Sequence, residues 1–270
     1  MDLGLDRATV VVNGGTKGMG RAAAECFAAE GARVCVLARG QAAIDDTVSA
    51  LLVAGSPDAF GVSTDLTVRA EVEAAFAAVG ARWDALNVLV NAAGPVDVGI
   101  NAFESLDDEE WMATFDIGAL SAVRCVRSAL PLLRRAEWAR IVNVSAHSTK
   151  RQTAGLVAYT ASKAAMTSIS KNLSLSLASD GILVNTVSPG SFLSAGMVGY
   201  LRSLPAERGV DPSSLEDAMR VITEDFGHPA HLPRAGAPEE IGPVIAFVGS
   251  RVNSYMTGAN VNVDGGSDFA

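Results

Sequence analysis

The sequence is poor in positive charge, and this shortage excludes some classes of partner. Its 270 residues contain 21 Lys and Arg against 30 Asp and Glu, which gives a net charge of −9. Nucleic-acid binding needs a positive electrostatic footprint, so we expect no nucleic acid as a partner. The same acidic balance disfavours docking to an anionic membrane surface.

Long apolar runs and a secretory signal are also missing. Residues 1–7 include neither a basic nor an apolar segment of the kind that opens a signal peptide. The longest uncharged run, residues 182–201, is interrupted by polar and helix-breaking residues: Asn185, Ser188, Pro189, Gly190 and Gly196. We therefore expect no membrane-spanning helix.

Cysteine is scarce, with three residues at positions 26, 35 and 125. Their odd number and wide spacing favour buried free thiols over a disulfide framework. This use of cysteine indicates a reducing compartment, and we expect a cytoplasmic protein. We assign no metal ligands.

The composition and the order of the expected elements predict one α/β domain over residues 1–270. The chain is 49% hydrophobic and 19% charged, an ordinary balance for a large core. Strand patterns alternate with helical patterns, which predicts a doubly wound, Rossmann-type parallel sheet with helices on both faces. We expect strands at 9–13, 33–38, 59–64, 86–90, 140–144, 182–187 and 260–263, and helices at 21–30, 41–53, 68–83, 107–137, 164–179 and 238–249. Residues 191–235, rich in Gly, Pro and Ser, break this rhythm.

A glycine-rich loop follows the first strand. Gly14, Gly18 and Gly20 have the spacing G-x-x-x-G-x-G, and an Ala-rich helical stretch comes after them. A strand, a glycine loop and a helix together point backbone N–H groups and a helix N-terminus at a phosphate. This arrangement favours nucleotide binding.

The end of the second strand bears on the choice of cofactor. An acidic residue there would favour NAD, because it would bind the adenosine ribose. The sequence instead has Ala38 followed by Arg39, and Lys17 lies in the glycine loop. Two cations suit a 2′-phosphate, so NADP(H) is favoured over NAD(H). The alternative is that both are solvated surface cations.

Tyr159 and Lys163 are four residues apart in a helical region. Residues i and i+4 share one face of a helix, so a phenol and an ammonium lie side by side. A neighbouring cation lowers the pKa of a phenol from about 10, which makes Tyr159 a candidate general acid or base. A surface pair without function would have the same spacing.

Taken in order, these motifs resemble those of the short-chain dehydrogenase/reductase family over essentially the whole chain. The matching segments are Asn13-Gly-Gly-Thr-Lys-Gly-Met-Gly20, Asp65-Leu66, Asn91-Ala-Ala-Gly94, Tyr159-x-x-x-Lys163, Ser188-Pro-Gly190 and Val263-Asp-Gly-Gly266. Asn13 stands where the family usually has threonine, and it still offers hydrogen bonds.

The resemblance implies an NAD(P)-dependent oxidoreductase that transfers hydride between nicotinamide and a carbonyl or alcohol carbon of a small molecule. Tyr159 would move the proton, and Lys163 would bind the nicotinamide ribose and lower the pKa of Tyr159. Residues 191–235 would form the substrate-binding lid, and the assembly would be a homotetramer. The implied cofactor-binding residues are Gly14, Thr16, Lys17, Gly18, Met19, Gly20, Arg39, Asp65, Leu66, Asn91, Ala92, Gly94, Tyr159, Lys163, Pro189, Gly190, Phe192 and Ser194.

Two residues depart from the family pattern. The family's catalytic serine is expected 13 residues before Tyr159, but this position is Ala146. The position of the family's active-site asparagine is Gly118. Ser148, which we include in the catalytic set, could supply the missing donor, as could Ser145 or His147. Alternatively, the enzyme reduces a conjugated C=C bond or a quinone, a reaction that needs less help from a hydrogen-bond donor. A third alternative is a cofactor-binding protein with impaired catalysis.

Overall fold

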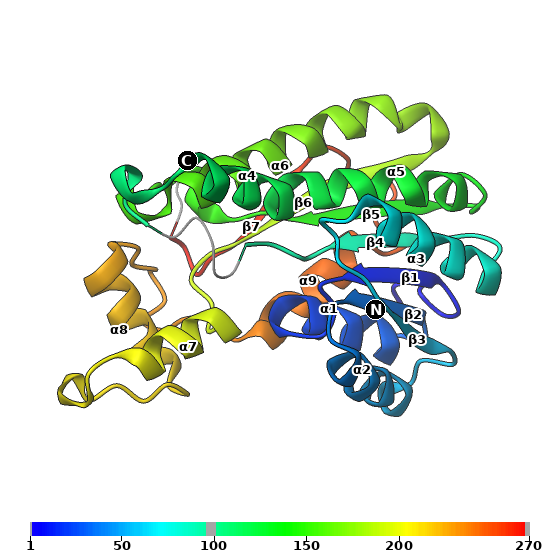
Figure 1. Ribbon diagram of the computed structural model, residues 1–270. Coiled ribbons are helices and arrows are strands. Elements are labelled where there is room, and N and C mark those ends of the chain that lie inside the picture. Colours follow the sequence, from blue (N-terminus) through cyan, green and yellow to red (C-terminus); the bar gives the residue numbers. More distant parts are fainter. Residues whose placement is uncertain (1, 96–100, 268–270) are drawn as a thin grey trace.

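Seven parallel strands form the centre of the protein in a computed structural model that describes residues 2–95 and 101–267. The strands lie in the order β3-β2-β1-β4-β5-β6-β7 (Figure 1). Their bounds are β1 Thr9–Asn13, β2 Arg33–Ala38, β3 Ala59–Ser63, β4 Val88–Asn91, β5 Ala139–Val144, β6 Ile182–Pro189 and β7 Asn260–Val263. The order reverses between β1 and β4, and ligands bind beyond the carboxyl ends of strands at such a point.

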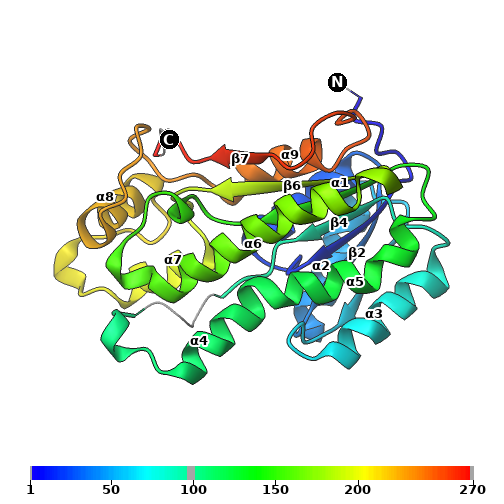
Figure 2. The same cartoon turned by 90° about the horizontal axis from the view of Figure 1, so that it is seen from above.

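Helices cover both faces of this sheet, as the alternating pattern predicts (Figures 1 and 2). One face carries α1 Gly18–Ala29, α2 Gln41–Ala54 and α9 Pro238–Val248. The other carries α3 Arg69–Arg82, α4 Asp108–Phe115, α5 Ser121–Leu133 and α6 Val157–Ser176. The predicted fold class, a doubly wound parallel sheet, is confirmed.

Alternate residues of each strand supply the two halves of the core. In β1, Val10 and Val12 pack with Phe27 of α1 and Ile245 of α9. Val11, which points to the opposite face, packs in the core formed by α3 and α5. Side chains on both faces are buried, so the strands read as continuous apolar runs. No helix of the described residues combines the length and the apolar character needed to cross a membrane.

The predicted helix at 107–137 is wrong in one respect, because the structure divides it. A π-helical turn, Asp116–Leu120, separates α4 from α5. Such a turn inserts an extra residue into the helix and often marks a functional site. Gly118 lies in this turn and packs closely against α6. The helical pattern on either side is continuous, so it gives no sign of the inserted residue.

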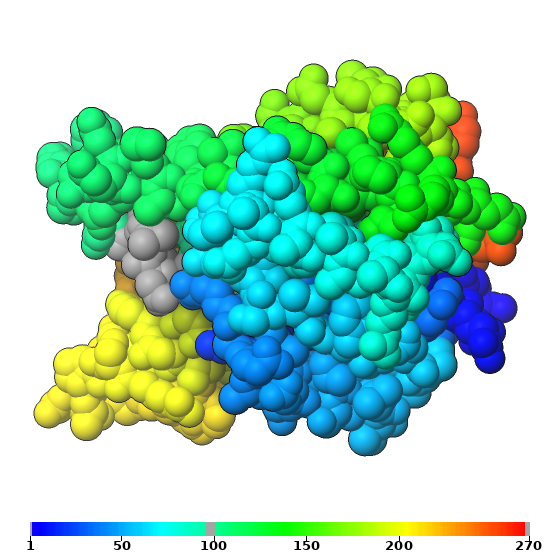
Figure 3. Space-filling model, turned by 45° about the vertical axis from the view of Figure 1, so that its right-hand side comes forward, coloured from blue at the N-terminus to red at the C-terminus, as the bar shows by residue number. Residues whose placement is uncertain are grey.

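Residues 191–235, expected to be irregular, contain two helices. They are α7 Ala195–Ser203 and α8 Leu215–Phe226, whose N-termini are capped by the side chains of Ser194 and Ser214. A small separate core, which includes Leu201, Ala218, Met219, Val221 and Ala235, holds them together. Figure 3 shows this segment, in yellow, as a lobe beside the blue and cyan N-terminal half.

Candidate active site

The loop between β1 and α1 forms a cradle of backbone. Gly14 and Gly18 have φ angles of +66° and +50°, a region that favours glycine. A Cβ on Gly14 would lie 2.8 Å from the backbone nitrogen of Ala93, and one on Gly20 would collide with the Gly14 carbonyl. No side chain caps the N-terminus of α1, and its first turn holds no acidic residue. The backbone N–H groups of this loop and of the uncapped helix N-terminus fit the diphosphate of a dinucleotide. Thr16 and Lys17 complete the loop, and Met19 follows in the first turn of α1.

Exposed cations lie beside the loop, at the end of β2. Arg39 and Lys17 are both exposed, and neither pairs with an acidic side chain among the residues described. The carboxylate of Asp65 accepts hydrogen bonds from the backbone and hydroxyl of Thr67 at 2.9 and 2.7 Å. These bonds, and more weakly Arg39, lower the pKa of Asp65. Leu66, next in the chain, is buried.

A chain of buried amides crosses the carboxyl ends of the central strands. Asn13 donates to Asn91, and Asn91 donates to Asn143 at 2.6 Å. Asn143 then donates at 2.8 Å to Ser170 on α6. This chain fixes the ends of β1, β4 and β5 relative to α6, because each buried amide has its partner in the next element.

Asn13 also accepts hydrogen bonds through its carbonyl oxygen. The backbone nitrogens of Ala92 and Ala93 donate to it at 3.0 and 3.1 Å. One side chain therefore holds the start of the Asn91–Gly94 segment and begins the amide chain. The amide does this with two separate atoms, since its nitrogen donates to Asn91 while its oxygen accepts from the two backbone groups.

Tyr159 and Lys163 lie on the first turns of α6, on one side of the helix. The Lys163 ammonium donates to the Val144 carbonyl at 3.0 Å and is 3% exposed. A Cβ on Gly94 would lie 2.9 Å from Lys163 Nζ, so the glycine leaves room for the ammonium at this position. The backbone of Lys163 is held in turn, since Ser145 Oγ donates to its carbonyl at 3.0 Å.

The expected lowering of the Tyr159 pKa is wrong for this state of the protein. Burial raises the pKa of Tyr159 to about 12. Burial also lowers the pKa of Lys163 to about 8. Desolvation disfavours both charged forms, and the Lys163 ammonium turns toward a carbonyl rather than the phenol.

The loop after β5 contains the residues that could replace the missing serine. Ala146 is 5% exposed and offers no donor. Ser145 is engaged with α6, bonding Lys163 and Thr167. The Ser148 hydroxyl is buried and finds no hydrogen-bond partner among the described residues. His147 lies with Nδ1 3.3 Å from the Pro189 carbonyl. Of the three candidates, Ser148 therefore has a hydroxyl that is not already bonded.

The end of β6 leads into residues 191–235, the expected lid. Gly190 approaches Asp264 so closely that a Cβ there would lie 2.6 Å from its Cα. The Phe192 ring is buried against Gly236, and the Ser194 hydroxyl caps α7 by accepting from the Met197 backbone at 3.2 Å. Pro189, Gly190, Phe192 and Ser194 thus follow one another from the sheet edge to the lid, with the last two side chains engaged within the protein.

The structure adds two residues that the sequence did not single out. His228, which follows α8, packs edge-on against His147, with ring centroids 5.3 Å apart. Arg124 of α5 donates to the Leu66 carbonyl and pairs with Asp116 in the π-helical turn. No local pattern marks either one, because each contact joins segments far apart in the chain.

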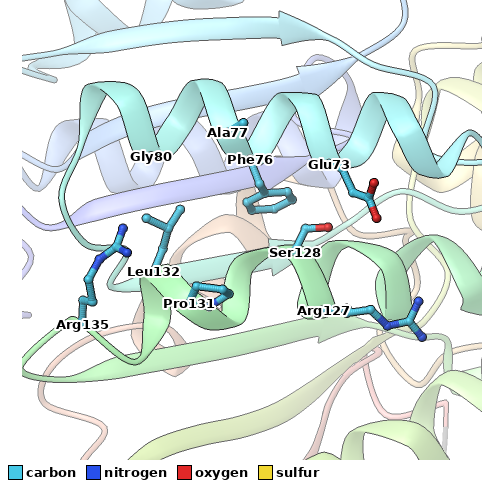
Figure 4. Close-up of a pocket in the computed structure, with 9 residues that line it drawn as sticks. All are labelled: Glu73, Phe76, Ala77, Gly80, Arg127, Ser128, Pro131, Leu132 and Arg135. Atoms are coloured by element: carbon cyan, nitrogen blue, oxygen red, sulfur yellow. The ribbon is translucent and has the colours of Figure 1, made fainter.

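The surface of the described residues also has two hollows. One, of about 360 Å³, runs between α3 and α5 and is lined by Phe76, Gly80 and Leu132 among others (Figure 4). The other, of about 430 Å³, lies between Phe103 and the start of α6 at Val157. The first is on the helical face of the sheet, away from the carboxyl ends of the strands.

Known proteins match this chain along nearly its whole length. Residues 8–204 match the family described as short chain dehydrogenase. Meso-2,3-butanediol dehydrogenase of Serratia marcescens is 33% identical over 262 residues, covering 97% of this chain and 95% of that protein. The short-chain reductase NovJ of Streptomyces niveus is 33% identical and covers 95% and 92% of the two chains.

Solved structures agree in fold. L-sorbose reductase of Gluconobacter frateurii, in complex with NADPH and L-sorbose, gives a TM-score of 0.91 at 26% identity, covering 99% of this chain and 98% of that one. RhlG of Pseudomonas aeruginosa, in complex with NADP, gives 0.85 at 28% identity, covering 98% of each chain. The chain therefore belongs to the short-chain dehydrogenase/reductase family and is an NAD(P)-dependent oxidoreductase.

Proposed function

We propose that this enzyme is an NADPH-dependent reductase of a small carbonyl compound, with Tyr159 as the proton donor. The observation that carries the proposal is the position of Lys163. Its ammonium lies against Gly94 and the end of β5, one helical turn from Tyr159. The nicotinamide ribose of the cofactor and the substrate would meet between Lys163 and Tyr159.

When bound, the nicotinamide cofactor supplies or accepts the hydride. The glycine loop of residues 14–20 would hold its diphosphate through backbone N–H groups. Asp65 and Leu66 would flank the adenine, and Asn91, Ala92 and Gly94 would lie along the cofactor. Residues 189–194 would hold the carboxamide chiefly through backbone, since Phe192 and Ser194 have engaged side chains.

The Tyr159 phenol is protonated at neutral pH, as a proton donor in the direction of reduction must be, although burial raises its pKa to about 12. Lys163 would bind the nicotinamide ribose. Its pKa of about 8 leaves it mostly charged at pH 7, so it can stabilise the phenolate once the proton has left.

Ser148 would orient the substrate carbonyl in place of the absent hydroxyl at Ala146. The support is its buried, unpartnered hydroxyl two residues further along the same loop. A buried donor without a partner costs about 1–3 kcal/mol, so a ligand oxygen that accepts from it would recover this energy.

NADP(H) is proposed over NAD(H) because of Arg39 and Lys17. Both are exposed and without an acidic partner among the described residues, and no carboxylate follows β2. The NADPH and NADP complexes of the two similar structures agree with this preference.

The substrate would lie under the lid of residues 191–235. The similar proteins are named for a butanediol and for L-sorbose, and others for a 3-oxoacyl group. A carbonyl or alcohol carbon is common to these names. We therefore place hydride transfer at such a carbon rather than at a conjugated C=C bond or a quinone.

We also propose a cytoplasmic homotetramer. The three cysteines are free thiols, as a reducing compartment requires. Two groups among the exposed apolar residues lie on separate parts of the surface. Met112 and Leu120 lie on the α4–α5 side, whereas Phe247 lies on α9 and Val252 and Tyr255 lie between α9 and β7. Two self-complementary faces of this kind can build a closed tetramer.

Replacement of Tyr159 by Phe tests the proposal. We expect turnover with NADPH to fall by roughly 10³-fold or more, because the proton donor is removed, while NADPH binding stays nearly intact. Retention of turnover would place the donor elsewhere. If the wild type binds NADPH tightly but reduces no ketone, the alternative of impaired catalysis, due to Ala146 and Gly118, would be correct.

A further inference from the structure

Two of the protein's three histidines, His147 in the loop after β5 and His228 in the proposed lid, form a buried pair. His147 comes directly after Ala146, and His228 follows α8. Their rings meet edge-on at 77° with centroids 5.3 Å apart. They are 6% and 4% exposed, respectively. His147 also lies against the Pro189 carbonyl, so the pair borders the ends of β5 and β6.

Hydrogen-bonding atoms of this cluster are left without partners. Neither ring nitrogen of His228 has a hydrogen-bond partner among the described residues, and the same holds for the nearby Ser148 hydroxyl. Each such buried group costs about 1–3 kcal/mol, and native proteins keep few of them without a reason. The three atoms belong to two segments that flank the position of the missing serine. A ligand with two polar atoms would pair with the Ser148 hydroxyl and with one ring nitrogen of His228, since the two nitrogens of the ring point in different directions.

The charge of the cluster limits the ligand. Burial, and then His147 and Arg151, lower the pKa of His228 to about 4, so its ring is neutral at pH 7. A neutral imidazole has one donor and one acceptor, as a hydroxyl group does. The Arg151 guanidinium donates to the Pro229 and Ser267 carbonyls at 3.4 and 3.2 Å, so it is occupied in holding these segments.

We propose that His228, backed by His147, is a specificity site for a hydroxyl group on the carbon next to the reacting carbonyl. The substrate class is then a neutral α-hydroxyketone, or the vicinal diol in the reverse direction. Ser148 donates a hydrogen bond to the carbonyl oxygen, and one ring nitrogen of His228 makes a hydrogen bond with the neighbouring hydroxyl. This inference rests on the proposed function, because it takes Tyr159 and Ser148 as the reacting end of the site.

Hydroxyacetone and butan-2-one test it, since the two ketones differ by a hydroxyl in place of a methyl group. The measured quantity is the ratio of their kcat/KM values with NADPH, in the wild type and in His228→Phe, which keeps an aromatic ring against His147. We expect the ratio to fall by about 100-fold or more, because a site built to bond a hydroxyl discriminates strongly. Arg134→Ala, at an exposed arginine that pairs with Asp180 and lies outside the lid, should leave the ratio unchanged.

Other results would overturn the inference. An unchanged ratio in His228→Phe would mean that the residue does not read the hydroxyl. Faster turnover of pyruvate than of hydroxyacetone by the wild type would show that the cluster prefers a carboxylate.

A binding measurement keeps this inference separate from the proposed function. The Tyr159→Phe enzyme with NADP⁺ is titrated with propane-1,2-diol and with butan-2-ol, and the ring nitrogens of the three histidines are followed by NMR. Shifts of the His228 signals with the diol and not with the alcohol would support the site even if turnover does not depend on Tyr159. Equal responses to the two ligands, or none, would refute it even if Tyr159 proves essential.

Discussion

Ser162 occupies the space into which a side chain at position 118 would extend. A Cβ built on Gly118 would lie 2.8 Å from the Cβ of Ser162 and nearer still to its hydroxyl. That hydroxyl donates to the Tyr159 carbonyl at 2.8 Å, so it is part of the first turns of α6. The residue at position 118, where the family has asparagine, is therefore limited in size by Ser162. Ser162 lies on the same helix as Tyr159 and Lys163.

Gly118→Ala should destabilise the protein by about 1–3 kcal/mol, the usual cost of overpacking a tight site. Ser162→Gly in the same chain should recover part of this loss, since it removes both atoms that the new Cβ meets. Denaturant unfolding of the two single variants and the double variant measures the coupling between the sites. Strictly additive effects would show that the two positions do not share this space.

Gly80→Ala provides a matched control. Gly80 is also a helical glycine, but a Cβ there would meet Leu132 at 3.4 Å, an ordinary contact beside the hollow of Figure 4. Alanine is favoured over glycine inside helices by about 1 kcal/mol. We therefore expect a neutral or stabilising effect at Gly80. A similar loss at both sites would point to a general sensitivity of the helices rather than to Ser162.

Much of this fold follows from the sequence because the pattern is strong. The strand and helix periods, and the glycine loop after β1, predict the parallel sheet and its ligand-binding edge. The π-helical turn was missed because it changes hydrogen bonding without changing composition. Helices α7 and α8 were missed because Gly, Pro and Ser surround them, although Ser194 and Ser214 are good N-caps.

The sequence predicts site residues only where they belong to a motif with fixed spacing. Tyr159 and Lys163 are separated by a fixed spacing, and the structure places them on one helix. The direction of the Tyr159 pKa could not be predicted, because it depends on burial and on where the Lys163 ammonium points. The pairing of His147 with His228 joins residues 81 positions apart, and no local pattern encodes such a contact.

The Ser148 hydroxyl makes a prediction about turnover. Ser148→Ala should lower kcat by about 10²–10³-fold, as is typical when one preorganised donor to a developing oxyanion is removed. Adding Ala146→Ser to that variant should restore part of the rate, since it returns a hydroxyl to the loop at the family position. Steady-state kinetics with NADPH and a ketone measures both effects. An unchanged kcat in Ser148→Ala would remove this residue from the catalytic set.

Cofactor preference should change with Arg39. Arg39→Asp removes a cation that would face the 2′-phosphate and introduces a carboxylate suited to a ribose hydroxyl. We expect NADPH binding to weaken by about 10–100-fold, the loss of one charge-assisted hydrogen bond, and NADH binding to be maintained or improved. Fluorescence titrations of both cofactors measure this, with Arg69→Ala on α3 as a surface control. Tighter binding of NADH than of NADPH by the wild type would contradict the assignment.

Stability should depend on pH through His228. Its pKa is about 6.5 in the unfolded chain and about 4 in the folded protein, because burial disfavours the imidazolium. The unfolded state therefore binds more protons between these values. The contribution of His228 is complete above pH 6.5, and it is lost as the pH falls toward 4, by about 3 kcal/mol in all. His228→Phe should make the unfolding free energy less dependent on pH in this interval, and an equally steep dependence would refute the assignment.

The edge of the sheet at β7 should be an interface of the proposed tetramer. Tyr255 is 98% exposed, and the apolar residues Val252 and Phe247 lie near it in the chain. Tyr255→Asp places a charge on this face and should dissociate the assembly into smaller species, as measured by light scattering after gel filtration. Val53→Asp is a matched control, since Val53 is 90% exposed but lies on α2 rather than beside β7. Its variant should keep the native mass. If the Val53 variant dissociates while the Tyr255 variant does not, the interface lies at α2 rather than at β7.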